Sequence, residues 1–161
     1  MTDYPTEHAW LFDKYPYAFG WACTYTTDTA GRPILLTTRD ERIQLLAGGM
    51  IDPGELPHQA AIRETREETG RVLTGELTLL ASVFRPADER FPVRFGYIFD
   101  GGMMTDAEIE AIVLSEEHTD YGVRSLAEWQ PLVPPEQFTL ISQLDAARRT
   151  GVPAYIARPG L

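Results

Sequence analysis

The sequence predicts an α/β/α sandwich, in which a mixed β-sheet lies between helices, within the broader α/β (α+β) class. Its 161 residues, 43% hydrophobic and 24% charged, are typical of a single globular domain with one sizeable core. Runs that alternate apolar and polar residues, the pattern of half-buried strands, occur on both sides of a segment with helical spacing. A final amphipathic segment follows, and this order fits a sheet flanked by helices.

Strand patterns come first along the chain. Residues 17–26 alternate and are rich in aromatic and β-branched side chains, which predicts a strand. A turn over 28–33 separates it from a second, buried strand over 34–38. Residues 43–46 form a further short apolar run, and a glycine-rich loop follows over 48–54.

Two helices are predicted. The first covers residues 56–69, since Pro57 suits the first turn of a helix and Gly70 suits the position just past its end. The second covers residues 135–150 and is closed by Gly151.

Between the two helices, the pattern returns to strands. Residues 77–84 and 93–99 are predicted strands, joined by a polar loop over 86–90. Residues 106–114 fit either a short helix or a loop, and residues 116–125 are expected to be irregular.

The chain ends carry few signals. Residues 1–15 include the apolar run 10–12, so we expect an N-terminal extension packed on a single domain spanning 1–161; this run would also suit a homodimer interface. No secretory signal and no run of roughly 18 apolar residues is present, which argues against a membrane partner. Cys23 is the only cysteine and excludes an intrachain disulfide, so a cytoplasmic location is expected.

The chain is acidic, with 24 Asp and Glu against 14 Lys and Arg and a formal net charge of -10. Such a chain has no general attraction for the nucleic-acid backbone, so a nucleic-acid partner is not expected. If it handles a phosphate compound, a bound cation held by carboxylates must supply positive charge.

One helix face gathers carboxylates. At 100° per residue, Glu64, Glu67 and Glu68 lie within about 100° of one another, with Arg63 at the border. Their mutual repulsion would be relieved by a hard divalent cation such as Mg²⁺, and Arg63 can hold Glu55 in a bidentate pair. A glutamate-rich helix taken alone is most often a solvated surface. The spacing of the glutamates relative to other residues must therefore decide between a solvated surface and a metal site.

The spacing resembles the Nudix box, here at residues 49–71. All seven fixed positions match, namely Gly49, Glu55, Arg63, Glu64, Glu67, Glu68 and Gly70. The strand pattern around it is similar to the Nudix fold over roughly residues 17–145. Three positions depart from the family pattern: Thr65 and Arg71 stand where a bulky aliphatic is usual, and Ala47 stands where a proline is common.

The resemblance implies a hydrolase that cleaves the pyrophosphate of a nucleoside diphosphate linked to another moiety, of the ADP-ribose or NDP-sugar type. Water attacks phosphorus with help from Mg²⁺ or Mn²⁺. By position, Glu67 and Glu68 would bind metal, Glu64 would be a further ligand or the general base, and Arg63 and Glu55 would form an orienting pair.

A backbone carbonyl of Gly48 or Gly49 would complete the implied metal shell. Many Nudix proteins also place a glutamate in a loop beyond the box, for which Glu116 and Glu117 are the candidates, followed by His118. The general base therefore stays open among Glu64, Glu116, Glu117 and His118, and a solvated acidic loop is an equal alternative.

Substrate contacts are expected after the box, where arginines can bind phosphate and aromatic rings can stack on a base. The candidates are Phe84, Arg85, Arg94 and Tyr97, although Tyr97 also suits a core strand. Pro86 lies fifteen residues beyond the box, where ADP-ribose-cleaving relatives tend to carry proline.

Three other functions compete with this expectation. The first is cleavage of nucleoside or deoxynucleoside triphosphates to monophosphates. The second is a non-catalytic nucleotide sensor, which would not need three clustered carboxylates. The third, an RNA-decapping enzyme, is disfavoured by the net charge of -10.

Overall fold

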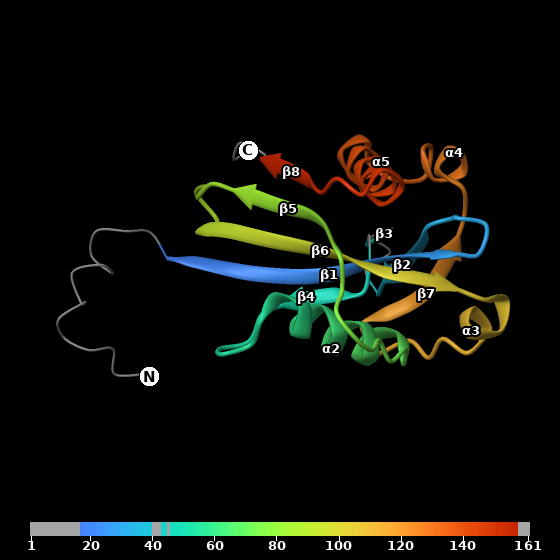
Figure 1. Cartoon of the computed structure of the whole chain (residues 1–161). Helices are drawn as coiled ribbons and strands as arrows, with labels where there is room; N and C mark the ends of the chain where they lie inside the picture. Colours follow the sequence, from blue (N-terminus) through green and yellow to red (C-terminus); the bar gives the residue numbers. More distant parts are fainter. Residues whose placement is uncertain (1–16, 40–42, 45, 158–161) are drawn as a thin grey trace.

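The computed structural model describes residues 17–39, 43–44 and 46–157, so the expectations for residues 1–15 fall outside the described part. Figure 1 shows a mixed sheet with helices on both sides, as the sequence predicts. The elements, in chain order, are β1 (Ala18–Asp28), β2 (Ile34–Thr38), β3 (Ile43–Gln44), β4 (Gly48–Met50), α2 (Pro57–Thr69), β5 (Leu79–Arg85), β6 (Val93–Met104), α3 (Asp106–Glu110), β7 (His118–Val123), α4 (Leu126–Trp129), α5 (Pro135–Thr150) and β8 (Ala154–Ala157).

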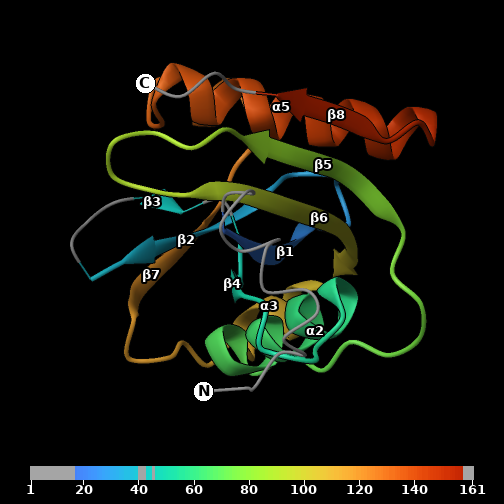
Figure 2. The same ribbon diagram turned by 90° about the vertical axis from the view of Figure 1, so that its left-hand side faces the viewer.

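The strands form two sheets rather than one. The larger has the order β4-β1-β6-β5-β8, and the smaller has the order β3-β2-β7. Figure 2, turned by 90°, shows α5 and α2 on opposite sides of the larger sheet. Strand β1 pairs in parallel with β6 and antiparallel with β4, so the larger sheet is mixed.

Several short or extended strands differ from the expectations. The predicted loop over 48–54 begins with β4, and the predicted irregular stretch over 116–125 contains β7. The strand expected to end at residue 99 continues to Met104, and it stays paired with β1 beyond a register shift at Tyr25/Thr26, where Gly102 has a φ of 76°. These elements depend on pairing with distant strands, which local patterns do not report.

Alternation along β1 divides its side chains between two cores. Cys23 and Tyr25 pack with Leu144 of α5 on one face. Ala22 packs with Ala60 and Ala61 of α2 on the other. Because β4 pairs with β1 directly beside this second core, the backbone of Gly48–Met50 lies against α2.

Two departures from the family pattern have structural explanations. The Thr65 hydroxyl donates to the Ala61 carbonyl at 2.7 Å and lies 2.9 Å from Thr24 Oγ1, so a buried hydrogen-bonded pair replaces aliphatic packing. Arg71 Nη1 and Nη2 donate to the carbonyl oxygens of Gly101 (2.5 Å) and Met103 (3.1 Å). Arg71 thereby ties the end of α2 to the second half of β6.

Arg71→Ala is expected to lower the free energy of unfolding by about 2 kcal/mol, because it removes both hydrogen bonds and the packing of the arginine stem. Urea denaturation measures the change. Arg71→Met keeps the apolar stem and should recover part of the loss. An Arg71→Ala protein as stable as the wild type would show that this link contributes nothing.

Within the described ranges, each helix is too short or too polar to cross a bilayer.

Candidate active site

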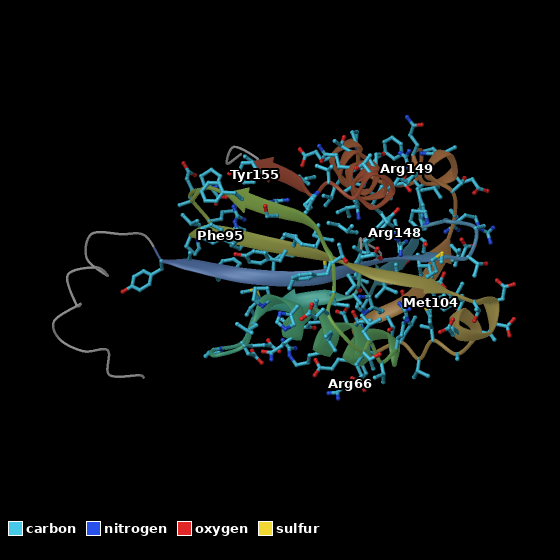
Figure 3. All side chains as sticks on the ribbon, in the orientation of Figure 1. Arg66, Phe95, Met104, Arg148, Arg149 and Tyr155 are labelled. Carbon is cyan, nitrogen blue, oxygen red and sulfur yellow. The ribbon has the colours of Figure 1, made fainter. Side chains whose placement is uncertain are left out.

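Helix α2 carries the three glutamates next to β4. The helix begins after Leu56, whose N–H donates to Gln59 Oε1 at 3.0 Å, and ends at Gly70, whose φ of 74° is left-handed. Figure 3 shows Arg66 of this helix pointing away from the sheet. Glu64 and Glu68 lie on the side of α2 that faces β4, next to Gly49 and Gly48 respectively, whereas Glu67 is exposed.

Glu68 is buried, with 5% of its surface exposed, whereas the sequence pattern placed it on one polar face with Glu64 and Glu67. Its Oε2 accepts a hydrogen bond from the Gly48 N–H at 2.8 Å. Burial raises the pKa of Glu68 to about 7, and the charges of Glu64, Glu117 and Glu67 act in the same direction against the Gly48 hydrogen bond. A bound cation would offset both the burial and the carboxylate repulsion that raise this pKa.

The glycines of β4 allow the backbone to approach the carboxylates. A Cβ at Gly48 would collide with Cys23 and with the Ala22 carbonyl oxygen. A Cβ at Gly49 would collide with the Glu64 carboxylate. No side chain fits at either position without displacing one of these groups.

Arg63 organises the remaining carboxylates. Its Nε and Nη2 donate to the two oxygens of Glu55 at 2.9 and 3.0 Å, and Nη2 also donates to the Met50 carbonyl oxygen at 2.9 Å. Its Nη1 donates to Glu64 Oε1 at 2.7 Å and to Glu67 Oε2 at 3.2 Å. The hydrogen bond from Arg63 is the main cause of the lowered pKa of Glu55. Arg63 and Glu55 thus form a bidentate pair that draws Glu64 and Glu67 together.

The donor set fits a hard divalent cation. Three carboxylates and the β4 backbone supply oxygen ligands of the kind Mg²⁺ prefers. In the part of the chain that the structure describes, no three acidic, His or Cys side chains already surround a common point. Glu64 and Glu67 instead accept hydrogen bonds from Arg63, and the Glu67 side chain is half exposed.

The loop before β7 approaches Glu68. His118 is buried, and its Nε2 lies 3.9 Å from Glu68 Oε1. Burial lowers the pKa of His118, against the opposing charge of Glu117, so the imidazole is neutral near pH 7. Glu116 and Glu117 are exposed. Sequence reasoning missed Arg39, which binds the backbone of this loop at Glu116; its place directly after a predicted strand was the available signal.

The four predicted substrate residues do not lie together. Alternation along β6 puts Tyr97 on the face of α2, where it packs against the core of Ala22 and Phe99. Arg94 lies on the opposite face, where it pairs with Asp88. Phe84 and Arg85 are adjacent in β5 and therefore divide between the same two faces. Figure 3 shows Phe95, whose ring centre is 5.4 Å from that of Phe84, at the sheet end opposite Met104.

Comparison with known proteins agrees with this fold. The model of the NUDIX domain matches residues 16–155. A NUDIX hydrolase from Nitrosomonas europaea superposes with a TM-score of 0.68 at 16% identity, covering 91% of this chain and 81% of that one. MutT protein from Methanosarcina mazei gives 0.64 at 20% identity, covering 82% and 96%. An Ap4A hydrolase from C. elegans gives 0.61 at 22% identity, covering 82% and 98%. A search of curated protein sequences gives no significant match.

Proposed function

This chain belongs to the NUDIX family of pyrophosphohydrolases, which act on phosphorus-containing acid anhydrides, and we propose its substrate, its metal and the roles of its residues. The substrate is a nucleoside diphosphate linked to another moiety, of the ADP-ribose or NDP-sugar type. Hydrolysis depends on Mg²⁺, which Mn²⁺ can replace.

The observation that carries the proposal is the buried carboxylate of Glu68 beside Gly48 of β4. A carboxylate whose charge is disfavoured by burial and by three other carboxylates destabilises the folded chain. A divalent cation would remove that cost and would turn the cluster into a site for phosphate oxygens. This supports Glu64, Glu67 and Glu68, with the Gly48 or Gly49 carbonyl, as the groups that hold the metal.

When bound, the metal would polarise the phosphate and lower the pKa of a bound water. The chain's own residues orient the carboxylates and accept the proton. Arg63, fixed by Glu55, orients Glu64 and neutralises part of the acidic cluster. Among the candidate bases, Glu117 is best supported, because its carboxylate is exposed to water in the loop that bonds to the Glu68 backbone, whereas His118 is buried.

The substrate class follows from charge and from the family. A chain with a net charge of -10 offers small phosphate anions little attraction except at a metal site, which favours a compact nucleotide over a nucleic acid. Cleavage of nucleoside triphosphates to monophosphates is the second candidate, because the fold is shared with proteins that bear different names, MutT and Ap4A hydrolase, and does not by itself select a substrate.

The test is product release from a panel of ADP-ribose, NDP-sugars, dinucleoside polyphosphates and nucleoside triphosphates, with Mg²⁺, with Mn²⁺ and with EDTA. Turnover of a diphosphate-linked compound that stops in EDTA supports the proposal. Turnover of triphosphates alone would favour the second candidate. Tight binding without turnover of any compound would identify a sensor.

A further inference from the structure

We propose that Arg39 is a positioning residue for this reaction: its guanidinium fixes the backbone of residues 115–117, the loop that carries Glu117 beside the end of α2. The inference rests on the proposed function. It assigns a positioning role to an arginine outside the box.

Arg39 donates hydrogen bonds to main-chain oxygens of the loop rather than to its side chains. It directly follows β2, and its Nε donates to the Glu116 carbonyl oxygen at 2.8 Å. Its Nη2 donates to the same oxygen. The Arg39 backbone N–H donates to the Glu117 carbonyl oxygen at 3.0 Å. Three donors of one residue therefore hold two consecutive carbonyls, whatever the state of the neighbouring carboxylates.

The other side of the loop is attached to α2. The Ser115 N–H donates to the backbone oxygen of Glu68 at 3.2 Å, and the His118 N–H donates to the Ser115 carbonyl oxygen at 3.2 Å. The β2–β7 ladder reaches His118, which pairs with Thr38 after a register shift, so residues 115–117 lie beyond its end. Hydrogen bonds therefore hold the loop on two sides, to Arg39 and to the end of α2, the helix that carries the glutamates.

The position of Glu117 depends on these backbone anchors. Among the described residues, its carboxylate forms no hydrogen bond or ion pair that would fix it. Its position therefore follows the loop backbone, which the Ser115 N–H ties to the Glu68 carbonyl oxygen at 3.2 Å. Thr38, Arg39, Glu116 and Glu117 line a pocket open to solvent, so water has access to this carboxylate.

The experiment compares Arg39→Gln, Arg39→Lys, Glu117→Gln and the double variant Arg39→Gln/Glu117→Gln on the best substrate of the panel. Arg39→Gln is expected to lower kcat by about 10- to 100-fold, the scale of misplacing one catalytic group, with KM unchanged. Arg39→Lys should recover part of the rate, because its ammonium can still donate to the Glu116 carbonyl oxygen. In the Glu117→Gln background, Arg39→Gln should cause no further loss.

A second readout does not require turnover. Hydrogen exchange of the peptide covering residues 113–119 should accelerate in Arg39→Gln and remain unchanged in Arg149→Gln. Arg149 is an exposed arginine of α5 whose ion pair with Asp145 lies away from the loop, so it controls for the loss of one surface charge.

Three results would overturn the inference: a full-rate Arg39→Gln protein, a loss that multiplies with that of Glu117→Gln, or a raised KM with kcat unchanged, which would make Arg39 a substrate contact. A wild-type protein that hydrolyses nothing in the panel would refute the proposed function, and this inference with it. Normal wild-type turnover with a silent Arg39→Gln would refute this inference alone.

Discussion

Glu68→Gln is expected to lower kcat by at least about 10²-fold while making the metal-free protein more stable at pH 8. The loss of rate follows from removing a charged metal ligand from a preorganised site. The gain in stability follows because glutamine still accepts the Gly48 hydrogen bond but carries no buried charge. A variant that is better folded and almost inactive separates catalysis from stability at this position.

The stability difference between Glu68→Gln and the wild type depends on pH. The pKa of Glu68 is about 7 in the folded chain, above its ordinary value of 4.5, so the unfolded chain loses this proton first as the pH rises. The contribution of Glu68 to wild-type stability should therefore be fully present below about pH 4.5 and should be lost, by up to about 3 kcal/mol, as the pH rises through about 7.

Thermal unfolding in EDTA between pH 4.5 and 8 measures the effect. The Tm difference between Glu68→Gln and wild type should be small at pH 4.5 and positive at pH 8. Glu76→Gln, at an exposed glutamate of the loop before β5, is the matched control and should show neither effect. A destabilised Glu68→Gln protein at pH 8 would contradict the buried charge.

Glu67→Gln is expected to lower kcat by at least about 10²-fold with little change in stability. Its side chain is half exposed, and its only hydrogen bond among the described residues is the one it accepts from Arg63 Nη1 at 3.2 Å. An exposed ion pair of this kind contributes little to folding. The carboxylate therefore has a large effect only if it binds the metal.

Steady-state kinetics at saturating Mg²⁺ and urea denaturation of the same preparation measure both quantities. Glu76→Gln again serves as the control. A Glu67→Gln enzyme with a near-normal kcat would remove Glu67 from the metal site. A normal kcat in both glutamate variants would reject the whole metal assignment.

The sequence identified the carboxylates but not their environment. The spacing from Gly49 to Gly70 predicted the helix and the Arg63–Glu55 pair, because both depend on neighbours within one helix and one loop. Periodicity could not predict that Glu68 is buried, since it gives a direction around the helix axis and not the depth of the neighbouring strand. The burial comes from β4, a three-residue strand that exists only by pairing with β1.

Long-range pairing also explains the other differences. Strand β7 forms on β2, and β8 forms on β5, each far away along the chain. The separation of Arg94 from Tyr97 follows from strand alternation, which the sequence contains, but the face that each residue occupies depends on where α2 and α5 pack. Arg39 acts on a loop 77 residues away, a relation that no local motif encodes.

We propose that the glutamates of α2 bind a catalytic divalent cation. Titration of Mn²⁺ into the metal-free protein, followed by electron paramagnetic resonance, measures this binding without turnover. The wild type should bind Mn²⁺ in competition with Mg²⁺, and the Glu67→Gln/Glu68→Gln protein should bind it at least about 10-fold more weakly while keeping its fold. Equal Mn²⁺ affinity in the two proteins would contradict the claim.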